Sequence, residues 1–164
     1  MIILGIDPGL GTIGYGVIET VGMKQRVVDY GVITTPPKMP IPKRLNMIFD
    51  SVSELYERFR PDAVAVEELF FTNNITTGIN VAQARGVILA ALAKKTDALY
   101  EYTPMQVKQA VVGYGKAEKA QVQLMVRSLL NLRETPRPDD AADALAAALC
   151  YVNSGRMEGT FKIK

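Results

Sequence analysis

Three short apolar stretches open the chain. Residues 2–6 are continuously apolar, a second stretch covers residues 14–19, and apolar side chains alternate with other residues over residues 27–34. Glycines and polar residues separate these stretches, as is typical of strands joined by tight turns. The pattern therefore predicts a meander of three strands. Residues 36–42, which contain four of the nine prolines, are expected to form an extended connector.

Helical and extended patterns alternate after this connector. Apolar residues recur every three or four positions from Leu45 to Phe59, which predicts an amphipathic helix that ends near Pro61. Residues 63–66 form a short apolar run that ends at Glu67, as expected for a central strand buried on both faces.

Residues 77–94 follow a helical pattern with small and apolar residues on two faces. One face carries Val81, Ala84, Ile88 and Ala91, and the other carries Ile79, Ala82, Gly86, Leu89 and Ala93. Both faces are expected to be buried, one of them in a subunit interface. A strand over residues 99–103 and three further helices follow, the first beginning at Pro104 and the last near Asp139.

This order predicts an α/β fold of ribonuclease-H-like layout: a three-strand antiparallel meander followed by parallel strands, flanked by helices. Residues 1–153 are expected to form one domain, which suits a chain of 164 residues, and residues 154–164 a flexible polar tail.

The longest apolar run has nine residues, too few to span a membrane. Asp7 interrupts the apolar start, so no secretory signal and a cytoplasmic location without a membrane partner are expected.

The composition restricts the chemistry that the chain can perform. It contains no histidine and one cysteine, which excludes histidine-based metal sites, catalytic triads that use histidine and an internal disulfide. Any reaction must use carboxylates, lysines, hydroxyls or backbone groups. The net charge of +2 neither indicates nor excludes nucleic-acid binding, so the distribution of charge matters more than its sum.

Acids from three separate places are candidates for a metal site. Asp7 ends the first strand, Glu67 ends the strand over residues 63–66, and Asp140 and Asp143 share one face of the last helix. Glu68 is expected to point away from Glu67. Four such carboxylates suit Mg²⁺, with Mn²⁺ as an alternative, and two ions about 3.5–4 Å apart would promote in-line attack on a phosphodiester.

Each acid also has an alternative explanation. Asp7 is followed by a glycine-rich turn, which would leave room for a phosphodiester beside a metal ion. The same turn could instead bind the phosphates of ATP, or Asp7 could cap its own turn. Glu67 could be a solvated loop residue. Asp139 fits the start of a helix, where free N–H groups stabilise a carboxylate, and this leaves open which of Asp139 and Asp140 joins a site.

Residues 104–133 contain five basic residues against one acid, Glu118; these are Lys108, Lys116, Lys119, Arg127 and Arg133. The segment is therefore a candidate phosphate-contacting surface, although a solvated helix face is the more usual explanation. Phe70 and Phe71 follow Glu67 in a polar segment, where aromatic rings can stack on unpaired bases or fold back into the core.

Five segments of the chain form a set that occurs together in one family: ILGIDPGLGTIGYG, VAVEELFFTNN, QARGV, QVKQAVVGYGKAEKAQV and DDAADAL. Along residues 1–153 the chain resembles the RuvC-type Holliday-junction resolvases. The resemblance implies a ribonuclease-H-like fold, a homodimer, and Mg²⁺-dependent paired nicking of four-way DNA junctions on two strands of like polarity in recombination and repair. It also implies the branch-migration proteins RuvA and RuvB as partners.

The resemblance extends to individual positions. It implies that the catalytic, metal-binding acids are Asp7, Glu67, Asp140 and Asp143, that Lys108 and Lys119 lie in the active site or contact DNA, and that Phe70 lies at the junction centre. Lys116 joins the predicted DNA-binding residues through the basic segment. The alternatives are another ribonuclease-H-like nuclease that acts on RNA or an RNA–DNA hybrid, an actin-like ATPase, and a non-catalytic DNA-binding protein.

Overall fold

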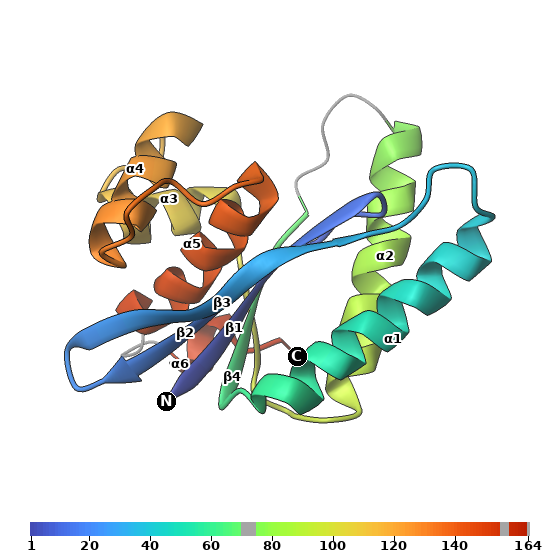
Figure 1. Ribbon diagram of the computed structural model, residues 1–164, viewed down its shortest axis with the longest axis horizontal. Helices are drawn as coiled ribbons and strands as arrows, with labels where there is room; N and C mark the ends of the chain where they lie inside the picture. Colours follow the sequence, from blue (N-terminus) through green and yellow to red (C-terminus); the bar gives the residue numbers. More distant parts are fainter. Residues whose placement is uncertain (70–74, 155–157, 164) are drawn as a thin grey trace.

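The computed structural model describes residues 1–69, 75–154 and 158–163, and its centre is a mixed five-stranded sheet (Figure 1). The strands are β1 (Ile2–Asp7), β2 (Thr12–Val21), β3 (Lys24–Thr34), β4 (Ala63–Glu67) and β5 (Leu99–Tyr102). They lie in the order β3-β2-β1-β4-β5; β3, β2 and β1 pair antiparallel, whereas β1, β4 and β5 pair parallel. The predicted meander followed by parallel strands is confirmed.

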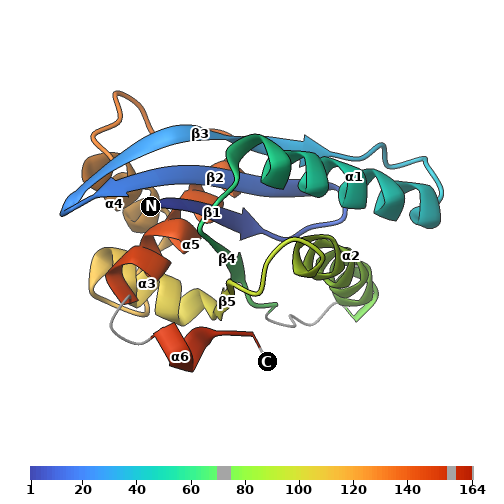
Figure 2. The ribbon, with the colours of Figure 1, turned by 90° about the horizontal axis from the view of Figure 1, so that it is seen from below.

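Helices cover both faces of this sheet (Figure 2). The helices are α1 (Ile41–Phe59), α2 (Ile75–Ala93), α3 (Pro104–Val112), α4 (Lys119–Leu129), α5 (Asp139–Ser154) and α6 (Glu158–Phe161). One hydrophobic core lies between the sheet and α1 and α2, and a second lies between the sheet and α3, α4 and α5. No helix of the described segments has both the length and the apolar character that crossing a bilayer requires.

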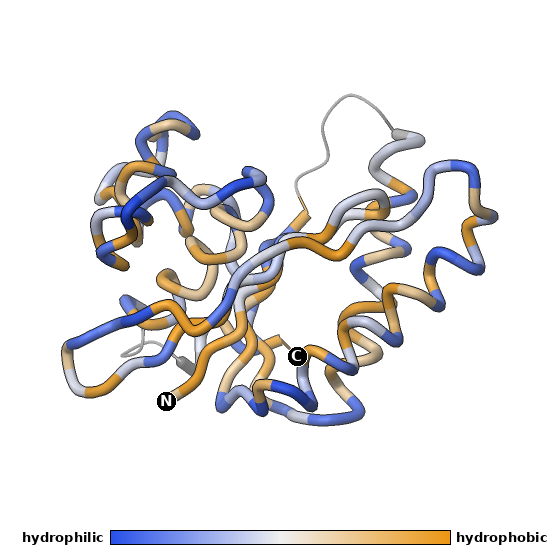
Figure 3. Tube along the Cα trace, in the orientation of Figure 1, coloured by the Kyte–Doolittle hydropathy of each residue, from blue (hydrophilic) through white to orange (hydrophobic). Residues whose placement is uncertain are grey.

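Side-chain alternation along the strands divides residues between the two cores. In β1, Leu4 and Ile6 pack toward α1 and α2, whereas Ile3 packs toward α5. In β4, Ala63 and Ala65 also belong to the α5 side. The first strand, which begins at the N-terminus, is orange along much of its length, while α1 alternates between hydrophobic and hydrophilic residues (Figure 3). Residues that continue the odd-numbered series, at the ends of β1 and β4, therefore face α5.

The backbone of α5 lies directly against β1 and β2. A Cβ atom on Gly5 would come within 1.9 Å of the carbonyl oxygen of Ala144, and one on Gly14 within 1.9 Å of that of Asp140. No L side chain fits at these distances, so glycine is required for the helix to approach so closely. The alanine-rich sequence of α5 serves the same end, because small side chains allow close packing.

One predicted boundary is wrong for an identifiable reason. The connector predicted over residues 36–42 is shorter, because α1 already begins at Ile41 with a proline in its first turn. A proline fits there since the first N–H groups of a helix have no partner within the helix. The two faces of α2 differ in the single chain: Ala84, Ile88 and Ala91 are buried in the core, whereas Ile79 is 52% exposed, so burial of the other face in a subunit interface stays a prediction.

The last described residues, which belong to the tail predicted over residues 154–164, pack on β5. The ring of Phe161 lies 5.0 Å from that of Tyr102, and Ile163 donates a backbone hydrogen bond to Leu99. An edge strand has unpaired backbone groups, and this short segment satisfies some of them. Cys150 is buried, and burial raises its pKa to about 11, as expected of a core residue and not of a reactive thiol.

The close contact at Gly14 predicts that Gly14→Ala destabilises the protein. Its Cβ would meet backbone, which cannot rotate away, so the free energy of unfolding should fall by about 1–3 kcal/mol in urea titrations. Gly11→Ala is the matched control, because its Cβ would have only an ordinary contact with Arg44 at 3.7 Å. Equal stability of the two variants would contradict this account of how α5 packs.

Candidate active site

Asp7 and Glu67 lie side by side at the carboxyl ends of two adjacent parallel strands. Ile6 of β1 is paired with Val66 of β4, so the next residue of each strand is an acid. Both belong to the odd-numbered series that faces α5, whereas Glu68 is exposed, as the alternation predicts. The carboxyl ends of parallel strands are where ligands commonly bind in open α/β sheets.

The first turns of α5 add two further acids. Gly14 is paired with Asp7 in the sheet, and the backbone of Asp140 lies directly over Gly14. The charges of Asp143 and Asp140 both act on Asp7, and that of Asp143 also acts on Glu67. Asp7, Glu67, Asp140 and Asp143, here called the acid cluster, thus converge from three elements.

Asp139 occupies a different position from Asp140. Its side chain is 51% exposed and its Oδ2 lies 3.6 Å from Nζ of Lys119. Asp139 is not among the charges that raise the pKa of Asp7, whereas Asp140 is. The charge of Asp140 therefore acts on Asp7, whereas Asp139 lies beside Lys119.

The acid cluster holds more negative charge than its surroundings compensate. Burial, reinforced by the charges of Glu67, Asp143 and Asp140, raises the pKa of Asp7 to about 8. Burial and the charge of Asp143 likewise raise the pKa of Glu67 to about 7, although Lys119, Lys108 and a hydrogen bond with Asp7 act in the opposite direction. Such shifts are expected where like charges are gathered away from water.

Lys119 supplies the main positive charge beside these acids. Its Nζ lies 2.9 Å from Oδ2 of Asp143. Partial burial alone would lower the pKa of Lys119, but the hydrogen bonds and charges of Asp143 and Asp139 outweigh burial and raise it. Burial also raises the pKa of Asp143, against the opposing influence of Lys119.

A cleft of about 180 Å³ opens beside the acid cluster. It is lined by Glu67, Pro104, Val107, Lys108, Lys119, Val122, Asp143 and Ala146. Two acids and two lysines thus face the same space between apolar walls. The sequence could not distinguish Val107 and Val122 as walls of a cleft, because their helical spacing is the same as that of core residues.

The acid cluster has the chemistry of a divalent-metal site. Carboxylate oxygens are the ligands that Mg²⁺ and Mn²⁺ prefer, and the raised pKa values mark carboxylates that lack a compensating cation. Within residues 1–69, 75–154 and 158–163, however, no three acids are already placed closely enough to hold an ion. The ammonium group of Lys119 lies beside Asp143, where it compensates part of the negative charge. Metal binding would therefore require the carboxylates to move closer together.

The predicted DNA-binding residues separate in the structure. Lys108 and Lys119 line the cleft, whereas Lys116 is exposed in the loop between α3 and α4 and is not part of the cleft lining. Phe70 lies outside the described residues. The basic segment is thus divided between the cleft and other surfaces of α3 and α4.

Comparison with known proteins places the chain among close relatives. The profile of the family described as crossover junction endodeoxyribonuclease RuvC matches residues 3–151. The crossover junction endodeoxyribonuclease RuvC of Alkaliphilus metalliredigens is 55% identical over 164 residues and covers 100% of both chains. The protein of the same name from Clostridioides difficile is 52% identical, over 99% of this chain and 96% of the relative.

Solved structures agree with these sequence relatives. RuvC of Thermus thermophilus in complex with a Holliday junction substrate superposes with a TM-score of 0.88 at 42% identity, over 99% of each chain. The yeast mitochondrial Holliday junction resolvase Ydc2 has a TM-score of 0.70 over 98% of this chain and 82% of its own, at 14% identity, a likeness that shows the fold alone. The predicted ribonuclease-H-like fold is therefore confirmed.

The raised pKa of Asp7 predicts that Asp7→Asn stabilises the protein in EDTA. An acid whose folded-state pKa lies above its ordinary value of 3.8 costs stability increasingly as the pH rises toward about 8. The melting temperature of the variant should exceed that of the wild type by several degrees at pH 8, and the difference should vanish near pH 4. Asp97→Asn, at an exposed position, should show no such dependence. A variant that melts below the wild type at pH 8, or a difference in melting temperature that does not change with pH, would contradict the burial of the Asp7 carboxylate.

Proposed function

Because the chain belongs to the RuvC family of crossover junction endodeoxyribonucleases, we propose that it resolves four-way DNA junctions by hydrolysing phosphodiester bonds at the acid cluster. It is an endodeoxyribonuclease of a metal-dependent family. The observation that carries the proposal is the convergence of Asp7, Glu67, Asp140 and Asp143 from three elements, beside two lysines of one cleft.

The four acids are the proposed metal ligands. When bound, two Mg²⁺ ions, with Mn²⁺ as a substitute, supply activation of the attacking water and neutralisation of charge on the leaving oxygen. The carboxylates of Asp7 and Glu67 hold the cations from the sheet, and those of Asp140 and Asp143 hold them from α5. No histidine is needed for this chemistry, in keeping with the composition.

The two lysines of the cleft orient the DNA. Lys108 and Lys119 place ammonium groups beside Glu67 and Asp143, so a phosphate that enters the cleft meets positive charge next to the carboxylates. Lys116 contacts phosphates outside the cleft, from the exposed loop between α3 and α4. The role of Phe70 at the junction centre, the partnership with RuvA and RuvB and the cytoplasmic location stay predictions.

The junction is approximately twofold symmetric, and a homodimer would match it with two identical sites. The exposed face of α2 is the surface we assign to the dimer. Ile79 on this face is 52% exposed, and a Cβ on Gly86 would meet nothing within 4 Å. A glycine inside a helix costs about 1 kcal/mol relative to alanine, and nothing in the described chain approaches it, so a close-packed helix of a second copy explains its presence.

The substrate is tested by incubating the protein with a synthetic four-way junction, a linear duplex and an RNA–DNA hybrid, each with Mg²⁺ or with EDTA. Symmetric nicks in the junction that require the metal are expected. Preferential cleavage of the hybrid would favour the alternative ribonuclease-H-like activity, and undiminished nicking in EDTA would contradict the role of the acid cluster.

Glu67→Gln is expected to lower the rate of nicking by about a hundredfold or more, because it removes one carboxylate from the proposed cation site. Its affinity for the junction, measured by mobility shift in EDTA, should be unchanged or higher, since a negative charge near phosphate is lost. Glu68→Gln is the matched control, because the neighbouring carboxylate is exposed and points to the other side of the strand. Equal activity of the two variants would count against the assignment.

Gly86→Leu is expected to dissociate the dimer while stabilising the helix of the monomer. Leucine raises helix propensity, but its side chain would prevent a second helix from approaching. Sedimentation equilibrium should show a shift toward monomer for this variant and none for Asn46→Leu, which adds leucine to the exposed surface of α1. A Gly86→Leu protein that remains as dimeric as the wild type would place the interface elsewhere.

A further inference from the structure

A second concentration of positive charge lies outside the cleft. Six residues line a hollow of about 420 Å³: Tyr30, Arg127, Arg133, Glu134, Thr135 and Arg137. They come from β3, from the last turns of α4 and from the loop over residues 130–138 that leads to α5. We call this surface the arginine hollow. Arg137 lies beyond the basic segment recognised in the sequence, and the fold brings it to Arg127 and Arg133.

The three guanidinium groups of the arginine hollow are exposed and uncompensated. Only one acid, Glu134, shares the hollow with them. None of the three forms an ion pair with another residue of the described ranges, whereas Arg26, Arg58 and Arg85 each pair with an acid. Three unpaired arginines that border one hollow repel one another, and a bound anion relieves this repulsion.

The chemistry of the arginine hollow suits phosphate groups on a polymer. A guanidinium group presents a planar fork of donors that matches phosphate oxygens, and several such groups can neutralise several phosphates at once. The exposed Tyr30 adds a hydroxyl donor at the rim, and Thr135 adds another. Such contacts recognise the shape and charge of the DNA backbone and do not read the base sequence.

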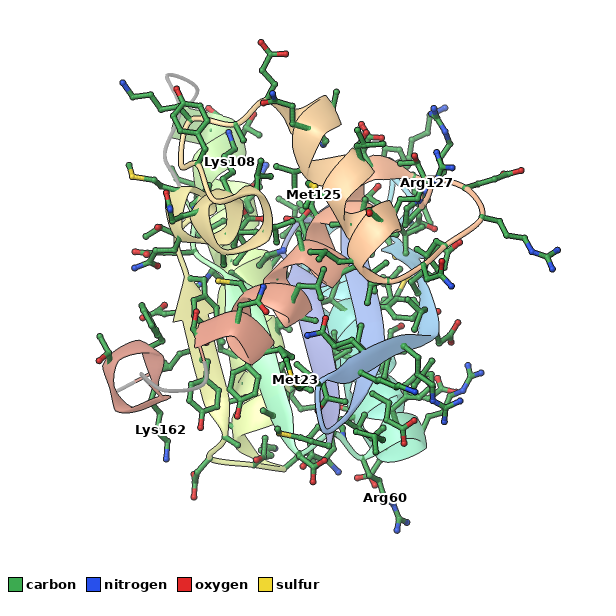
Figure 4. All side chains as sticks on the ribbon, turned by 90° about the vertical axis from the view of Figure 1, so that its left-hand side faces the viewer. Met23, Arg60, Lys108, Met125, Arg127 and Lys162 are labelled. Carbon is green, nitrogen blue, oxygen red and sulfur yellow. The ribbon has the colours of Figure 1, made fainter. Side chains whose placement is uncertain are left out.

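Helix α4 connects the arginine hollow to the cleft. Lys119 begins α4 and lines the cleft, whereas Arg127 lies in its last turn, eight residues later. At 1.5 Å per residue these positions are about 12 Å apart along the axis, similar to the width of the major groove of DNA. Lys108 and Arg127 lie on opposite sides of the same end of the molecule, and Arg60 and Lys162 lie at the other end (Figure 4).

We propose that the arginine hollow binds the phosphates of one duplex arm of the junction and so fixes the direction in which that arm leaves the cleft. This inference rests on the proposed function, since the arm belongs to the same DNA whose strand enters the cleft. The shared helix is the reason to favour DNA over an acidic protein: one rigid element holds both sets of cations at a spacing that suits two backbones of one duplex.

The test compares two triple variants that lose equal charge. Arg127→Gln, Arg133→Gln and Arg137→Gln together should weaken junction binding at least tenfold at low salt. They should also make the negative slope of log affinity against log salt less steep by about 3, because each lost phosphate contact reduces its magnitude by about 1. Lys24→Gln, Arg60→Gln and Lys162→Gln, all exposed and away from both sites, should change neither quantity comparably. Nicking at saturating protein should stay within about twofold of wild type for the variant at Lys24, Arg60 and Lys162, since it alters neither the acid cluster nor the arginine hollow.

A second measurement locates the contact on the DNA. Uncharged methylphosphonate links are introduced in one arm at increasing distance from the branch point. Neutral links at one position should weaken binding of the wild type but not of the arginine variant. Unchanged affinity and salt dependence in the arginine variant would overturn the inference. This is also the result expected if the hollow binds an acidic protein and not DNA. Failure of the wild type to nick the junction would instead overturn the proposed function, whatever the variants bind.

Discussion

The close packing of α5 against the sheet is the constraint on which the site depends. Gly5 and Gly14 allow the helix backbone to lie where any side chain would collide with it. Asp140 is therefore carried to Gly14 of β2, the residue paired with Asp7 of β1, and Asp143 follows one turn later on the same helix. With a wider separation between helix and sheet, Asp140 and Asp143 would lie away from the neighbouring carboxylates of Asp7 and Glu67, and the acid cluster would not form. The close backbone contact between α5 and the sheet is thus a condition for assembling the acid cluster.

The acid cluster lowers the stability of the folded protein. Desolvated like charges raise the pKa of Asp7 and of Glu67, and the ion pair between Lys119 and Asp143 offsets only part of this repulsion. Proteins retain such locally unfavourable arrangements where a ligand supplies the missing charge. The apolar walls of the cleft, Val107 and Val122, keep water away from the same charges and so strengthen both their repulsion and their attraction for cations.

Positive charge and oligomerisation are assigned to opposite layers of the molecule. α3 and α4 carry the lysines of the cleft, and α4 also borders the arginine hollow; both helices lie on the same side of the sheet as α5. α2 covers the other side and turns an apolar face with Gly86 outward. A second copy could pack on α2 without covering the cleft, so binding of DNA and pairing of subunits need not compete for one surface.

Much of this arrangement follows from local sequence. Alternation along β1 and β4 determines that Asp7 and Glu67 face the same side and that Glu68 does not, and helical spacing places Asp140 and Asp143 on one face. The order of strands and helices predicts the mixed sheet. These features depend only on the periods of strand and helix, which near neighbours in the chain establish.

Tertiary packing alone decided the rest. Glycines that could have bordered a phosphate instead admit α5, and this contact brings the backbone of Asp140 to Gly14, so that its charge acts on Asp7. The exposed face of α2, the separation of Lys116 from the cleft and the meeting of Arg137 with Arg127 likewise depend on which distant elements pack together. A local sequence pattern determines which side of a helix or strand is apolar or charged. Which other element packs on that side depends on contacts between residues far apart in the sequence.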